Sequence, residues 1–168
     1  MIYTSMKYIF AILLMLCTNA YTFGQATHNI HVDFTYPVND GIMIKNEPFY
    51  ASFSEKSIYF SESFKDSYVK MRRIEIEDTA SIRYYWNIVS KLFIDKTVNV
   101  VNSKPKCNSS EKPILKICVH GDNYSRQEYE YKINLCYTHF PENSGYSDEF
   151  IALLSFLETI IDKLNQMK

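Results

Sequence analysis

The most reactive side chains of this chain fall in two short stretches, and Cys118, His120 and Asp122 form one of them. Residues two apart on a strand share a face, so the imidazole of His120 could take the proton of the Cys118 thiol and create a nucleophile. The alternative is a small strand residue beside a turn histidine, with Asp122 serving the turn. We favour this alternative, because the sequence offers no residue that would orient His120.

The second stretch contains His28, His31 and Asp33. His31 and Asp33 share a strand face and could supply two metal ligands, whereas His28 points the other way, so the three do not converge on a straight strand. We therefore expect a polar strand face and no metal or other cofactor. Cleavage of the chain after Gln25 would change this, because a histidine at the third position forms a square-planar copper(II) or nickel(II) site with the free amine and two amides.

Tyrosine is abundant, with 14 copies in the chain. This residue is favoured at protein interfaces, where its ring buries a large area and its hydroxyl still forms a hydrogen bond. We expect Tyr84, beside the apolar stripe of a helix, and Tyr124, at the tip of a hairpin, to be exposed and available to a partner. The alternative is that most tyrosines are ordinary sheet residues.

Common catalytic and nucleotide-binding motifs are missing from the sequence. Past the N-terminal stretch only Gly41, Gly121 and Gly145 occur, too far apart for a phosphate-binding loop. The sequence has no G-x-S-x-G, H-E-x-x-H or C-x-x-C pattern. Its basic residues are scattered rather than gathered into the dense stripe that phosphates require, so we expect no nucleic-acid partner.

Composition places the chain among globular proteins. Its 168 residues are 46% apolar and 15% aromatic, with only four glycines and five prolines, which excludes collagen-like and disordered classes. The formal net charge of −1 indicates no particular partner. No apolar run beyond the N-terminus approaches the ~20 residues of a spanning helix, so we expect no transmembrane span in the mature chain.

The N-terminus has the pattern of an export signal, which we place at residues 1–24. Lys7 is followed by an apolar core of about ten residues, Tyr8 to Cys17. Cleavage could follow Ala20, Gly24 or Ala26. We favour Gly24 or Ala26, because cleavage at either leaves the first strand intact. We therefore expect a periplasmic or secreted protein.

A lipid anchor would need Cys17 as the acylated residue. The residue before it, Leu16, is bulky where a small one is required. We therefore expect no lipid anchor.

The remainder, residues 27–168, reads as one domain. Alternation predicts a strand over 28–36 that Pro37 ends, and further strands over 49–53, 57–60 and 71–77. A helix capped by Asp78 or Thr79 follows, because apolar residues recur at spacings of three and four: Ile82, Tyr85, Trp86, Val89, Leu92 and Phe93.

In the C-terminal half we again expect strands followed by a helix. We expect a short strand over 97–101, a hairpin that opens at Pro113 and turns at residues 121–123, and a final helix capped by Ser147. The order strands, helix, strands, helix predicts an α+β fold: an antiparallel sheet with two amphipathic helices packed on one face.

Removal of the signal segment with Cys17 leaves Cys107, Cys118 and Cys136, and the register of the hairpin limits which two of them can form a disulfide. Matching the apolar faces pairs Val119 with a residue near Tyr129 and puts Cys136 opposite about residue 112, six residues from Cys118. That is about 20 Å at ~3.3 Å per residue, whereas bridged α-carbons lie within about 7 Å. We therefore predict a Cys107–Cys136 disulfide and a free Cys118.

Together these observations favour an exported, non-enzymatic module that binds another protein, for example an immunity or inhibitor protein that neutralises a toxic exported enzyme. Two alternatives stay open. One is a small hydrolase around Cys118 and His120, which requires an accessible thiol of low pKa. The other is a carrier of a metal or small ligand, which requires a sizeable apolar pocket.

Overall fold

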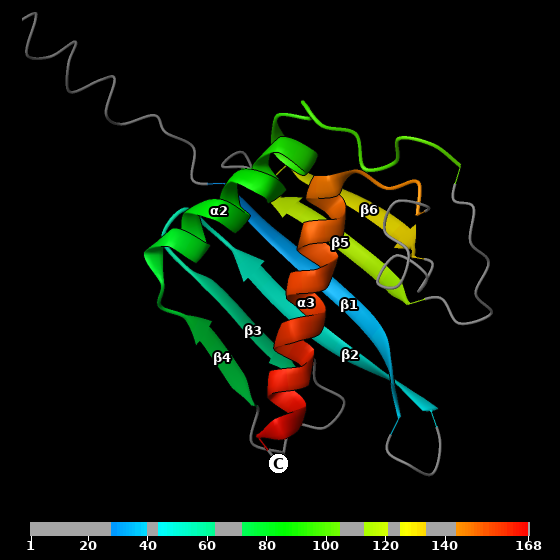
Figure 1. Cartoon of the computed structure of the whole chain (residues 1–168). Coiled ribbons are helices and arrows are strands. Elements are labelled where there is room, and N and C mark those ends of the chain that lie inside the picture. The colour runs from blue at the N-terminus through cyan, green and yellow to red at the C-terminus, as the bar shows by residue number, and fades with distance from the viewer. Residues whose placement is uncertain are drawn as a thin grey trace, which may run out of the picture.

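A computed structural model describes residues 28–39, 44–62, 72–104, 113–120, 125–133 and 144–167. The predicted signal segment and its cleavage points lie outside these ranges, as do Asp122, Tyr124 and the predicted Cys107–Cys136 disulfide. Within the described residues six strands form one antiparallel sheet in the order β4-β3-β2-β1-β5-β6. Two helices, α2 and α3, cover one face of that sheet (Figure 1). The predicted α+β fold is therefore confirmed.

The strands follow from alternation of apolar and polar residues. They are β1 (Asn29–Asn39), β2 (Ile44–Phe53), β3 (Ile58–Glu62), β4 (Arg73–Ile76), β5 (Ile114–His120) and β6 (Arg126–Lys132). Strand β1 lies at the centre, since it pairs with both β2 and β5. Alternate residues of the inner strands face the helices and many are buried, as Ile30, Val32 and Phe34 show on β1.

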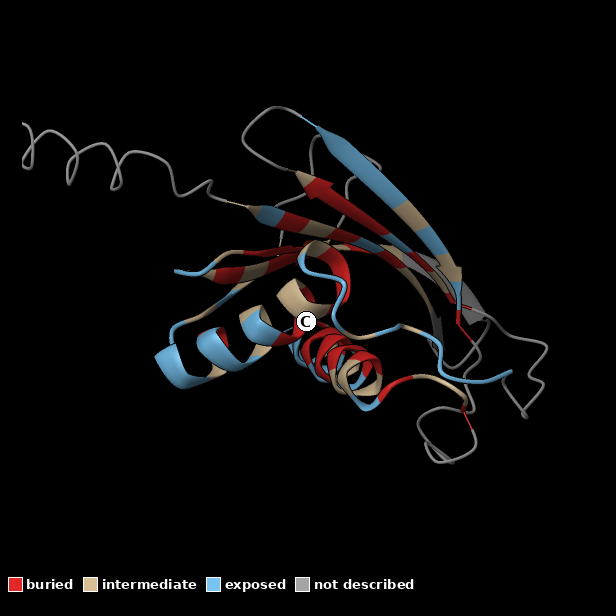
Figure 2. Cartoon of the chain, turned by 90° about the horizontal axis from the view of Figure 1, so that it is seen from above, coloured by how far each residue is buried: buried red, intermediate tan, exposed pale blue. Residues whose placement is uncertain are grey.

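Both helices begin at the predicted caps. Helix α2 (Thr79–Val89) starts after Asp78, whose carboxylate accepts hydrogen bonds from the amides of Ala80 and Ser81, and continues into the short π-helical turn η1 (Ser90–Ile94). Helix α3 (Asp148–Gln166) starts after Ser147. Its buried stripe packs onto the sheet beneath it (Figure 2) and consists of Phe150, Leu153, Leu154, Phe156, Leu157, Ile160, Ile161 and Leu164.

Two predictions about the strands are wrong. Strand β1 does not stop at Pro37 but runs to Asn39, paired there with β2 alone, because its ladder with β5 ends at Thr35. A proline costs no ladder hydrogen bond on a side where its strand has no partner among the described residues. Residues 97–101 are not a strand: only Val101 forms a bridge, to Tyr146.

The hairpin of β5 and β6 has the predicted faces. Val119 pairs with Gln127, two positions from Tyr129, which itself lies opposite Ile117. Gln127 occupies an inward-facing position at the open end of the hairpin, where it stays exposed. No helix among the described residues is long and apolar enough to cross a membrane.

Candidate functional site

The face of the sheet opposite the helices carries polar and aromatic side chains. Residues paired across an antiparallel ladder share a face, and the registers arrange this one in two rows. The first is Glu75, Tyr59, Ser52, His31, Cys118 and Glu128, and the second is Arg73, Ser61, Tyr50, Asp33, Lys116 and Glu130. We call these rows, with His120 and Arg126 at the end of the β5–β6 ladder, the open face. Both helices lie on the other side of the sheet (Figure 2).

The open face brings together the two reactive stretches of the sequence. His31 lies directly opposite Cys118, and Asp33 lies opposite Lys116. His120 is one alternate position beyond Cys118 on the same strand. His28, in contrast, occupies an alternate position that faces the other side of the sheet. It lines a polar cavity of about 110 Å³ with Phe93 and Gln127, among others.

Four rings form a continuous zigzag chain across the open face. The centroids of Tyr59 and Tyr50 are 5.9 Å apart, those of Tyr50 and His31 5.5 Å, and those of His31 and His120 4.9 Å. Each contact joins diagonal neighbours on adjacent strands, which lie within reach of aromatic side chains. We call this line, which runs over β3, β2, β1 and β5, the ring chain.

A hydrogen bond joins the middle of the ring chain, between the Tyr50 hydroxyl and Nδ1 of His31. Burial lowers the pKa of His31, His120 lowers it further, and Asp33 acts in the opposite direction. Burial and a hydrogen bond with Tyr59 raise the pKa of Tyr50 far above its ordinary value. Both shifts favour the uncharged form of the group at neutral pH.

Charged side chains surround the ring chain in pairs. Lys116 pairs with Glu130 at 3.7 Å and Arg126 with Glu128 at 3.3 Å. A third pair, Arg73 with Glu75 at 3.4 Å, lies on the edge strand β4. These side chains are all about half exposed, 47% to 58%, so the pairs add little stability and remain accessible to a partner.

Cys118 is the least accessible member of the open face. Its residue is only 4% exposed, and Nη2 of Arg126 donates a hydrogen bond to Sγ at 3.3 Å. The thiol is free, in agreement with the prediction from the hairpin register. A hydrolase built on this thiol needs it accessible, and its burial contradicts that requirement.

The burial of Cys118 predicts slow alkylation in the folded protein. We expect iodoacetamide to modify Cys118 at least about 100-fold more slowly in native buffer than in denaturant, because reaction requires local opening. Peptide mass spectrometry measures the rate at this position separately from the other cysteines, and the denatured chain is the control. Rapid native modification of Cys118 would restore the hydrolase alternative.

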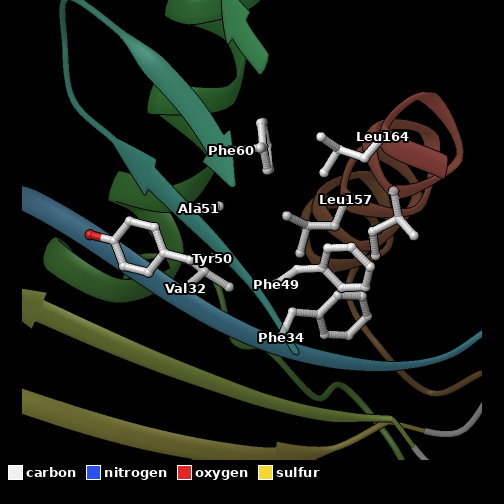
Figure 3. A pocket seen from close by; sticks show the side chains of 9 residues that line it. Val32, Phe34, Phe49, Tyr50, Ala51, Phe60, Leu157 and Leu164 are labelled. Atoms are coloured by element: carbon white, nitrogen blue, oxygen red, sulfur yellow. The ribbon is translucent and has the colours of Figure 1, made fainter. Parts of the chain in front are cut away.

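An apolar cavity lies on the opposite side of the sheet, between its inner face and α3 (Figure 3). Phe34, Phe49 and Leu157 are among its lining, while the phenol ring of Tyr50 points away from these three. The cavity encloses about 10 Å³, the room of roughly one water molecule. Carriers of small ligands need about 300 Å³ or more, so this cavity does not support that alternative.

The metal alternative has no geometric support in the part of the chain that the structure describes. No group of three or more histidine, cysteine, aspartate or glutamate side chains there could hold an ion. His31 and Asp33 share the open face, and His28 does not join them.

The two tyrosines predicted as binding residues do not belong to the ring chain. Tyr84 is 55% exposed on α2, on the helical side of the sheet, and Tyr124 lies outside the described residues. The open face also carries Tyr50 and Tyr59, which the sequence analysis did not single out but which strand alternation could have found. Each alternates with buried inward residues, Tyr50 between Phe49 and Ala51 on β2.

Comparison of the sequence with protein-family models finds no match, and comparison with curated proteins finds none either. The case for a function therefore rests on the open face itself.

Proposed function

We propose that the protein is an exported, non-enzymatic binding module that recognises another protein through the open face of its sheet. The observation that carries this proposal is the ring chain, an aromatic and imidazole line over four strands on the side that neither α2 nor α3 covers. Protein interfaces are enriched in tyrosine and arginine at their centres, and single aromatic anchors supply much of the binding energy.

The surroundings of the ring chain support a protein partner. The charged pairs around it contain both signs, so the face has no strong field that would select a polyanion or polycation. An aromatic centre within a rim of paired charges is the arrangement that dry, specific protein contacts use. Binding to such a centre should depend weakly on salt.

The backing of the ring chain also supports a binding role. Tyr50 and His31 stand on central strands whose alternate residues, Ala51 and Val32 among them, are buried under α3. A rigid scaffold fixes the side chains before the partner arrives, which reduces the entropy lost on association.

A concrete form of the proposal is an immunity or inhibitor protein that occupies the active site of a toxic exported enzyme. The export signal predicted at residues 1–24 supports a periplasmic or secreted location. The burial of Cys118 supports binding over hydrolysis.

The test is affinity purification of the tagged chain from its native envelope fraction at ~0.5 M salt, which screens exposed charges. Asp33→Arg changes the charge at an exposed position beside the ring chain, and Asp162→Arg makes the same change on the exposed side of α3. We expect the wild type and Asp162→Arg to retain one stoichiometric protein that Asp33→Arg loses. A partner lost equally from both variants, or none at all, would contradict the proposal.

A further inference from the structure

We infer that protonation of His31, beside His120, switches the open face between a state that binds its partner at neutral pH and a state that releases it at mildly acidic pH. This inference rests on the proposed function and adds its regulation. It begins with the contact of the two imidazole rings, 4.9 Å between centroids with an interplanar angle of 74°.

The edge-to-face contact of His31 and His120 suits two neutral rings or one charged ring. A positive charge on His120, whose ring centroid is 4.9 Å from that of His31, disfavours protonation of His31. The protonation of His31 is therefore coupled to the charge on His120.

The Tyr50 hydroxyl extends the effect beyond the two histidines. In neutral His31 the tautomer decides whether Nδ1 accepts the Tyr50 hydroxyl proton or donates its own. Protonated His31 carries hydrogens on both nitrogens, so Nδ1 can only donate to the Tyr50 oxygen, and the Tyr50 hydroxyl proton must point to another acceptor. Since the Tyr50 ring also contacts Tyr59, protonation at His31 disturbs the ring chain along its length.

Charged and titratable groups reach His31 from every strand that surrounds it. They are Asp33 on β1, Tyr50 on β2, Tyr59 on β3, Lys116, Cys118 and His120 on β5, and Arg126 and Glu128 on β6. The carboxylates favour protonation, whereas the cations and burial oppose it. For His31 burial and His120 outweigh Asp33, so acid places charge where the fold accommodates it poorly. A partner whose surface is complementary to the uncharged open face therefore binds less tightly once His31 is charged.

The first experiment needs no partner. In the purified chain labelled with ¹³C-histidine, the Cε1 resonance of His31 is followed by NMR from neutral to acidic pH. We expect its midpoint below the ordinary 6.5 and expect His120→Gln to raise it. A midpoint near 6.5 that His120→Gln leaves unmoved would overturn the inference.

A stability measurement gives the same answer independently. Because the pKa of His31 is lower in the folded state, the unfolded chain binds protons more readily, and the contribution to stability is present above pH 6.5 and lost below it. Urea unfolding should therefore show a fall in stability below that pH that is smaller in His31→Gln. An equal fall in both chains would count against the coupling.

The second experiment uses the protein captured in the affinity purification as the probe. We expect its dissociation constant to rise about tenfold from pH ~7.5 to pH ~5.5. The readout is the ratio of the dissociation constant at the acidic pH to that at neutral pH, which should approach one in the double variant His31→Gln/His120→Gln. Because a ratio is compared, a variant that binds more weakly at both pH values does not affect the result. An unchanged ratio would overturn the switch but leave the proposed function standing. If no partner is captured, both proposals fail, whatever the titration shows.

Discussion

Tyr50→Ala is expected to weaken binding of the captured partner by about 30-fold or more, which corresponds to the loss of a hot-spot side chain. Tyr50 occupies the middle of the ring chain, with the ring of His31 at 5.5 Å on one side and that of Tyr59 at 5.9 Å on the other. Its removal takes away the ring at the middle of the ring chain and frees its neighbours to change position. Titration calorimetry with the purified partner measures the change.

Two further variants show whether the effect belongs to the ring or to the fold. Tyr50→Phe keeps the ring and removes only the hydroxyl bonded to His31, so it should lose far less affinity at neutral pH. Tyr84→Ala removes an aromatic side chain that is 55% exposed on α2 and should leave the affinity within about twofold, as expected for a surface residue away from the interface. If Tyr84→Ala weakened binding as much as Tyr50→Ala, the docking surface would be on the helices instead.

Local sequence patterns predict the elements of this fold well. The apolar residues that recur every three or four positions in α3 are buried in the structure, because they form the face of the helix that packs on the sheet. The N-caps at Asp78 and Ser147 are equally local, since a side-chain oxygen reaches amides only two or three residues ahead. Pro37 shows the limit of such reasoning. Its effect depends on whether a second strand lies beside it, and that is decided by tertiary pairing.

The candidate site lies beyond local patterns for the same reason. Parity alone places His31, Asp33, Cys118 and His120 on polar faces of their strands. It does not reveal that β1 lies between β2 and β5, because neither neighbour's register can be read from one strand. The contact of His31 with Tyr50 and with His120 requires both ladders, together with the diagonal approach of their side chains.

Phe150→Ala is expected to cost about 3–5 kcal/mol of unfolding free energy, the usual loss for a large aromatic side chain in a core. Phe150 is fully buried in the first turn of α3, and its ring contacts those of Tyr131 at 5.5 Å and Tyr146 at 5.3 Å. The cavity left behind would lie where the helix joins the sheet. Against a typical stability of about 5–15 kcal/mol, this loss threatens the folded state.

The same residue separates the role of the helices from that of the open face. Urea unfolding of Phe150→Ala, with Tyr84→Ala as the exposed aromatic control, should show a large loss for the first and less than about 1 kcal/mol for the second. The fraction of Phe150→Ala that remains folded should still bind the partner, because its ring chain is intact on the opposite side of the sheet. A stability loss of less than about 1 kcal/mol for Phe150→Ala would mean that α3 is not packed on the sheet at this point. The rigid backing claimed for Tyr50 and His31 would then need another source.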